Sequence, residues 1–221
     1  IDNLEKMIEQ NIDKALLLSS TGTGKTYAAA FAMRHFGFNK VLFVVHRNQI
    51  AKQAMKSFCK VFGESVSMGM VSGTLNKKEI DKDYIFATIQ TLSKDENLCL
   101  FKPEHFEAII YDEAHHVSAA SYKKVMDYLK PQFTLGMTAT PDKRDDYIEG
   151  RNIYEIFNHN IAYEIRLQQA MEEDLLCPFH YFGITDLEWV DDTIGENKNS
   201  TKEQKLEDFR YLTSDERVDY V

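Results

Sequence analysis

Short, unbroken apolar runs recur along this chain and alternate with segments of helical periodicity. Two of these runs are Lys14–Ser20 and Lys40–His46, and the helical segments Thr26–Phe36 and Asn48–Phe62 follow them. A strand that is apolar at almost every position is buried on both faces, as in a parallel sheet between two helical layers. The alternation therefore predicts an α/β domain with a mainly parallel sheet covered by helices on both faces.

The same patterns extend over the rest of the chain. Further strands are expected at Val66–Met70, Tyr84–Thr88, Phe106–Tyr111, Phe133–Met137, Ile161–Arg166 and Pro178–Ile184. Further helices are expected within residues 1–13 and at Ser121–Leu129, Asn152–Phe157, Leu167–Leu175 and Thr201–Val221, with a polar loop at Trp189–Ser200.

Composition narrows the environment of the protein. No apolar run approaches the roughly 20 residues of a membrane span, so no membrane partner is expected. Cys59, Cys99 and Cys177 lack the CxxC spacing of zinc or disulfide sites, which favours a cytoplasmic location. The net charge is −9, and residues 186–221 hold 11 acidic against 5 basic side chains. The remainder is close to neutral, so charge neither supports nor excludes nucleic-acid binding.

A glycine-rich loop follows the first apolar run. Backbone N–H groups around Gly22, Thr23 and Gly24 can cradle phosphate oxygens, and the next helix adds its N-terminal dipole. Lys25 is expected to reach the β- and γ-phosphates of ATP and Thr26 to hold Mg²⁺, with Thr21 beginning the loop. Ser19 stands where the pattern GxxxxGK[ST] has glycine.

Two further motifs end two later strands. Asp112 is expected to bind Mg²⁺ and Glu113 to orient the attacking water. His115 is expected to couple to the γ-phosphate rather than to bind a metal, because HExxH spacing is absent. Thr138 and Thr140 carry hydroxyls that can bond toward Asp112 or His115 and shift with nucleotide state.

In this order the motifs resemble those of superfamily 2 helicases of the DEAH-box, type III restriction-enzyme kind. The resemblance covers roughly residues 14–185. The chain also resembles bacterial helicases of this group, some of which are fused to phospholipase-D-type nucleases. The resemblance implies the first RecA-like domain of a P-loop ATPase that binds ATP and Mg²⁺. It also implies nucleic-acid contacts, to DNA more than to RNA, at the upper edge of the sheet. Those residues are His46, Arg47, Ser72, Gly73, Thr74, Thr88, Gln90 and Thr91.

The resemblance also shows what this sequence does not contain. The family's adenine-contacting glutamine motif and the arginines of a second RecA-like domain are absent from the 221 residues. The first domain is expected to span 1–185, and 186–221 to be an acidic segment leading to that second domain. Because arginine fingers supply about 10³–10⁵ in turnover, this chain alone is expected to bind ATP and hydrolyse it slowly. Arg144 is the one internal candidate to replace them.

These expectations combine into a hypothesis about function. The chain is predicted to be the first motor domain of an ATP-dependent helicase or translocase. One alternative is the motor of a restriction system that pulls DNA without separating its strands. Another is a nucleotide-gated nucleic-acid-binding module with a vestigial ATPase, against which the intact Lys25, Thr26, Asp112 and Glu113 argue.

Overall fold

A computed structural model describes residues 1–71, 80–141 and 152–177. Ser72, Gly73, Thr74, Arg144 and every element expected after residue 177 lie outside the described residues. Residues Ile1–Pro178 form one compact unit. The expected boundary at 185/186 lies outside the described residues and stays a prediction.

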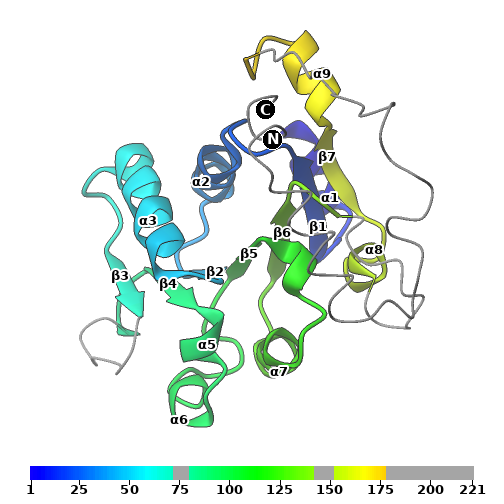
Figure 1. The fold of residues 1–221 in the computed structure, drawn as a ribbon. Coiled ribbons are helices and arrows are strands. Elements are labelled where there is room, and N and C mark those ends of the chain that lie inside the picture. Colours follow the sequence, from blue (N-terminus) through cyan, green and yellow to red (C-terminus); the bar gives the residue numbers. More distant parts are fainter. Residues whose placement is uncertain (72–79, 142–151, 178–221) are drawn as a thin grey trace, which may run out of the picture. The chain divides into compact units, whose positions relative to one another are not determined.

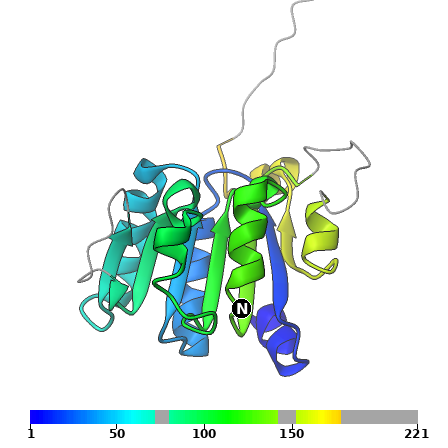
Figure 2. The same cartoon turned by 90° about the horizontal axis from the view of Figure 1, so that it is seen from below.

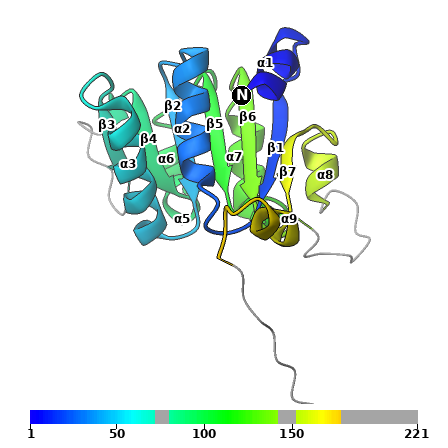
Figure 3. The same cartoon turned by 90° about the horizontal axis from the view of Figure 1, so that it is seen from above.

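Seven strands form one sheet in which every pair is parallel (Figures 1 and 3). Their order across the sheet is β3-β4-β2-β5-β6-β1-β7. The strands are β1 (Lys14–Ser19), β2 (Val41–Val45), β3 (Met68–Val71), β4 (Tyr84–Thr88), β5 (Ala108–Asp112), β6 (Phe133–Thr138) and β7 (Ile161–Ile165). The predicted α/β fold with a parallel sheet is therefore confirmed.

The helices lie close to their predicted positions. They are α1 (Asp2–Glu9), α2 (Lys25–Phe36), α3 (Asn48–Phe62), α5 (Ile89–Leu92), α6 (Asp95–Leu98), η1 (Ala114–His116), α7 (Ala120–Tyr128), α8 (Ile153–Ile156) and α9 (Leu167–Glu172). The short turns α5, α6 and η1 were not predicted individually, because three or four residues carry no helical periodicity. No helix of the described residues is long and apolar enough to span a bilayer.

Successive residues of each strand face opposite layers. In β1, Ala15 and Leu17 pack with α1, α2 and α3, whereas Leu16 and Leu18 pack with the layer that contains α5, α6, α7 and α8. Figure 3 looks onto the first layer, and Figure 2 shows α7 of the second layer, in green, in front of the sheet. Burial on both faces explains why the strands are apolar throughout.

The second layer packs closely against the sheet at Gly136 of β6. A Cβ at this position would lie 2.6 Å from Cζ of Phe157 and 2.8 Å from Cδ2 of Leu16, inside van der Waals contact. Phe157 follows α8 and is fully buried. Only a residue without a side chain allows this packing, which secures the strand that ends in Thr138.

Candidate nucleotide and nucleic-acid site

The motifs meet at one edge because the strands are parallel. The register aligns Leu18 with Thr138 and Asp112 with Met137, so the ends of β1, β6 and β5 are neighbours. On the other side of β5, Val45 is aligned with Thr88, which adds the ends of β2 and β4. Five adjacent strands therefore deliver the motif residues to one carboxyl edge, where parallel α/β sheets bind ligands.

The glycine-rich loop between β1 and α2 has the backbone path that a phosphate loop needs. Gly22 and Gly24 have φ angles of 92° and 86°, which residues with side chains rarely adopt. Gly24 precedes the first residue of the twelve-residue helix α2, and Ala28 N donates to its carbonyl at 3.0 Å. Thr26 is the second residue of α2, so the Thr26 hydroxyl and the loop both lie at the N-terminus of this helix.

The Lys25 ammonium lies against the start of this loop. Its Nζ donates to the carbonyls of Ser19 at 2.7 Å and Ser20 at 2.9 Å. The Thr23 hydroxyl donates to the Ser20 carbonyl at 2.8 Å and is also hydrogen-bonded to the Ser19 hydroxyl. Ser19, the departure from the family pattern, thus contributes a side-chain bond that closes the loop.

Lys25 and Asp112 have opposite charges, and burial shifts the pKa of both side chains. Burial lowers the pKa of Lys25, while Asp112 and Glu113 act in the opposite direction. Burial raises the pKa of Asp112 to about 6, and the Glu113 charge adds to this, whereas the Glu113 N–H and Lys25 oppose it. A desolvated carboxylate beside one ammonium is a group that a hard divalent cation would stabilise.

Glu113 has a backbone conformation that is uncommon for a side-chain-bearing residue. Its φ of 53° and ψ of 45° are left-handed, and its N–H donates to Asp112 Oδ1 at 3.0 Å. Residues held in this region cost about 1 kcal/mol or more and often occur at functional sites. The turn separates the two carboxylates: Asp112 is largely buried, and the Glu113 side chain is 44% exposed.

His115 lies between Glu113 and the third motif. Its Nδ1 is 3.3 Å from Glu113 Oε2 and 3.0 Å from Thr138 Oγ1, and its side chain is 8% exposed. The Thr140 N–H donates to Thr138 Oγ1 at 3.2 Å. The structure therefore joins Thr138 to His115 by a side-chain bond and Thr140 to Thr138 through the Thr140 backbone.

On the other half of the edge, His46 and Arg47 follow β2 and Gln90 follows β4. All three are exposed, and Gln90 Nε2 lies 3.0 Å from Nδ1 of His46. Arg47 directly precedes α3, and the N–H groups of Ile50 and Ala51 donate to its carbonyl. These side chains can reach a ligand lying across the edge.

Thr88 and Thr91 have a different environment from Gln90. The two residues are only 5% and 8% exposed, and the Thr88 hydroxyl donates to the Thr91 hydroxyl at 3.0 Å. Asn97 Nδ2 donates to the Thr91 carbonyl at 2.7 Å. The hydrogen bond between the two hydroxyls therefore stabilises the turn that contains Gln90.

Two features of this edge were not predicted from sequence. A Cβ on Gly22 would lie 3.1 Å from Cδ2 of Leu176, so the segment after α9 packs against the glycine-rich loop. No local signal in the sequence marks that contact. His116 contacts the rings of both His115 and His46. The pair His115-His116 was visible in the sequence, but only their placement reveals that contact.

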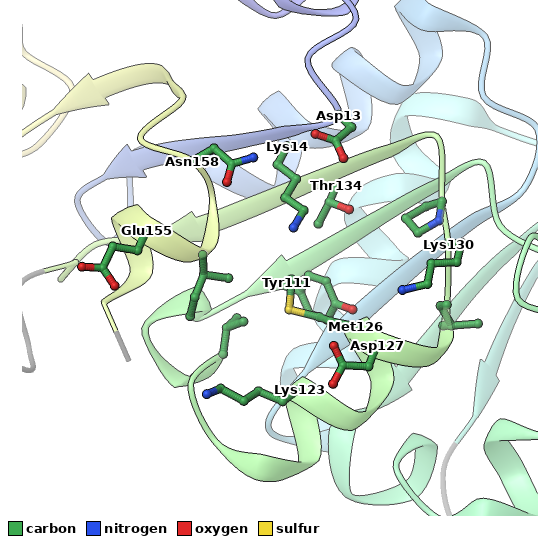
Figure 4. A pocket seen from close by; sticks show the side chains of 14 residues that line it. Asp13, Lys14, Tyr111, Lys123, Met126, Asp127, Lys130, Thr134, Glu155 and Asn158 are labelled. Carbon is green, nitrogen blue, oxygen red and sulfur yellow. The ribbon is translucent and has the colours of Figure 1, made fainter. Parts of the chain in front are cut away.

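A separate cavity of about 690 Å³ lies on the sheet face covered by α7 and α8 (Figure 4). Lys14 and Thr134 line it from the beginnings of β1 and β6, the opposite end of these strands from the motifs. Lysine and acidic side chains occur in equal number around it. This balance favours no charge class of ligand, and the motif side chains described above do not line the cavity.

Relatives of this chain occur among restriction enzymes. It is 26% identical over 251 aligned residues to the type I restriction enzyme EcoAI endonuclease subunit of Escherichia coli. The alignment covers 100% of this chain and 30% of that subunit. The chain thus spans about a third of the length of this relative.

Solved structures share the fold. The Pyrococcus furiosus Hef helicase domain aligns with a TM-score of 0.59 and 21% identity, over 74% of this chain and 37% of the other. A nuclease-deletion mutant of the type ISP restriction-modification enzyme LlaGI, solved with a DNA substrate mimic, aligns with a TM-score of 0.60 and 21% identity. That alignment covers 79% of this chain and 20% of LlaGI.

The family model described as "Type III restriction enzyme, res subunit" matches residues 1–143. This range contains the glycine-rich loop, the Asp112–His115 motif and the Thr138–Thr140 motif in their family order. Both the sequence match and the arrangement of these motifs on a parallel sheet agree with the resemblance. This chain therefore belongs to the ResIII family, whose model is described as the res subunit of type III restriction enzymes.

Proposed function

We propose that this chain binds ATP·Mg²⁺ and couples ATP hydrolysis to movement of the protein along a nucleic-acid strand. The observation that carries this proposal is the alignment of the motifs on adjacent strand ends. The glycine-rich loop, Asp112 and Thr138 occupy the ends of β1, β5 and β6, and the exposed His46 and Gln90 follow β2 and β4. Nucleotide and nucleic acid would thus bind to two halves of one edge.

The nucleotide half offers the donors that a magnesium triphosphate requires. Backbone N–H groups of the loop from Thr21 to Gly24 and the Lys25 ammonium would hold the phosphates. The Thr26 hydroxyl and the Asp112 carboxylate would hold Mg²⁺, which prefers oxygen ligands and usually retains several waters. When bound, ATP·Mg²⁺ supplies the phosphoanhydride bond whose hydrolysis drives the motor.

Glu113 and His115 would act on the hydrolytic water and on the response to it. The Glu113 carboxylate, partly exposed and 3.3 Å from His115 Nδ1, would accept a hydrogen bond from the water and take its proton. His115 would hold Glu113 and Thr138 in one hydrogen-bonded group. A change at Glu113 would then reach β6 through Thr138 and Thr140.

Efficient turnover would need groups beyond this chain. A second RecA-like domain would supply arginines to the transition state, and this chain alone would hydrolyse ATP slowly. Arg144, outside the described residues, is the internal alternative. The alignment to about a third of the EcoAI subunit is compatible with a motor that has further domains.

The nucleic-acid half would hold a strand through its backbone. His46, Arg47 and Gln90 are exposed at the edge, and hydroxyl, amide and cationic groups of this kind contact phosphates without reading sequence. Thr88 and Thr91 would support these contacts rather than make them. We propose DNA rather than RNA as the substrate, and the fold neighbour LlaGI, which was solved with a DNA substrate mimic, supports this choice.

A restriction-system motor that moves DNA without unwinding it is the second candidate. It is favoured by the family match and by the similarity to the EcoAI subunit. Strand-displacement and triplex-displacement assays on the full-length protein distinguish the two: unwinding displaces both probes, and translocation alone displaces only the triplex.

We also assign the protein to the cytoplasm, because Cys59, Cys99 and Cys177 are free thiols.

The proposal is tested by ATP binding and turnover in the full-length protein with and without DNA. Lys25→Ala should reduce DNA-stimulated turnover by about 10³-fold or more, since it removes the cation that contacts the phosphates. Lys52→Ala, an exposed lysine of α3, is the matched control and should retain wild-type turnover. Wild-type turnover in Lys25→Ala would refute the assigned nucleotide site.

A further inference from the structure

His116 lies between the two halves of the carboxyl edge. Its ring centroid is 4.1 Å from that of His115 and 5.4 Å from that of His46, with interplanar angles of 48° and 33°. His115 and His116 belong to η1 after β5, whereas His46 follows the neighbouring strand β2. His116 therefore contacts one ring on its own turn and one ring on the adjacent strand end.

The contacts continue in both directions from His116. Toward β4, His46 Nδ1 lies 3.0 Å from Gln90 Nε2. Toward β6, His115 Nδ1 lies 3.0 Å from Thr138 Oγ1 and 3.3 Å from Glu113 Oε2. Three imidazole rings thus connect the proposed water-orienting carboxylate to the amide at the nucleic-acid half.

His115 and His116 belong to the same short turn. η1 consists of only three residues, Ala114–His116, and begins at Glu113, whose backbone is left-handed. Because both rings project from this single turn, a rotation of the turn that displaces His115 also displaces His116. Such a displacement would change the contact of the partly buried His116 with the exposed His46.

We propose that His116 is a positioning residue that transmits the state of the nucleotide site to the His46–Gln90 pair. The inference rests on the proposed ATP-driven function and adds the residue that couples its two sites. His116 itself would touch neither nucleotide nor nucleic acid. Its effect would be to hold His46, and through His46 also Gln90, in the geometry that fits a nucleic-acid strand. It would do so only when Glu113 and His115 contact the bound nucleotide and its attacking water.

A metal site would be another use for three neighbouring histidines. No group of three or more potential metal ligands with suitable geometry occurs within 1–71, 80–141 and 152–177. The ring pairs His115–His116 and His46–His116 are both tilted, with interplanar angles of 48° and 33°. Ring-to-ring contact is therefore the interaction that the proposal uses.

The decisive measurement is the ratio of ATP turnover with saturating single-stranded DNA to turnover without it, in the full-length protein. An aromatic contact of this kind is worth about a fivefold change in a coupled equilibrium. His116→Ala should lower the stimulation ratio about fivefold while basal turnover and the KM for ATP stay within twofold of wild type. His116→Phe keeps a ring at this position and should restore most of the stimulation.

His35→Ala is the matched control. His35 contacts the Phe36 ring at 5.1 Å in α2, away from the carboxyl edge, and its loss should leave the ratio unchanged. A wild-type ratio in His116→Ala, or failure of His116→Phe to restore it, would overturn the assignment. Absence of ATP turnover in the wild-type protein would instead refute the proposed function on which the inference rests.

Discussion

The two halves of the carboxyl edge differ in how their polar groups are solvated. In the nucleotide half, Asp112 is desolvated enough to raise its pKa to about 6, and Thr138 and His115 are nearly buried. In the half proposed to bind nucleic acid, His46, Arg47 and Gln90 are exposed.

The difference has an energetic meaning. Charged groups desolvated in the absence of a ligand destabilise the folded protein, and a bound cation and phosphates would offset that penalty. Exposed groups carry no such penalty. Substitution of the desolvated Asp112 should therefore change stability as well as turnover, whereas substitution of the exposed His46, Arg47 or Gln90 should change binding alone.

The largest effect is expected at Glu113. Glu113→Gln in the full-length protein should lower ATP turnover by about 10³-fold, because the amide cannot accept the proton of the attacking water. ATP binding should remain within a fewfold of wild type, which separates this variant from Lys25→Ala. Single-turnover hydrolysis and equilibrium nucleotide binding measure the two quantities. Turnover within tenfold of wild type would remove Glu113 from this role.

Asp112→Asn should stabilise the protein in the absence of ligand. In the unfolded chain this carboxyl titrates near pH 4, and in the folded protein near pH 6. Between these values the folded state binds more protons, so the free energy of unfolding falls as pH rises from about 4 to about 6. Asparagine does not titrate and so removes that fall. At pH 7 the free energy of unfolding of Asp112→Asn should therefore be about 2 kcal/mol higher than that of the wild type.

Urea unfolding in a chelator at pH 4 and pH 7 measures the gain. The difference between Asp112→Asn and wild type should be small at pH 4 and full at pH 7. Asp127→Asn, an exposed aspartate of α7, should show no such difference. An equal gain at both pH values would mean that Asp112 titrates normally in the folded protein.

Thr138→Val tests the link between β6 and η1. Valine leaves His115 Nδ1 and the Thr140 N–H without the Thr138 oxygen, so the free energy of unfolding should fall by about 1 kcal/mol. Thr134→Val, in a buried threonine of the same strand away from the motifs, should change stability less. Chemical denaturation of the two variants gives the comparison, and equal losses would argue against a specific role for the Thr138 hydroxyl.

Arg47→Ala should have the smallest effect on the protein itself. Stability should stay within about 0.5 kcal/mol of wild type, because the side chain is exposed. DNA affinity should fall severalfold, and the slope of log affinity against log salt should decrease by about one if Arg47 contacts one phosphate. Fluorescence anisotropy over a salt series measures both, and an unchanged slope would exclude that contact.

The layered fold was predictable because its signals are local. Runs such as Lys40–His46 are apolar at nearly every position, and the structure places β2 there at Val41–Val45. The boundary of β5 was less predictable: Phe106 is buried but lies before the strand, which begins at Ala108. Burial alone does not define a strand end, since pairing with a neighbouring strand decides where the ladder starts.

The sequence by itself determined the chemistry available at the edge. Residue type and spacing predict the chemistry of Gly22, Gly24, Lys25, Asp112 and Glu113. A parallel sheet brings these residues to its carboxyl edge. Only the tertiary structure decided which of these groups are buried and which touch. The strand order β4-β2-β5-β6-β1 places His46 beside His116 although 70 positions separate them. Contact across strands depends on sheet order, and no local pattern encodes that order.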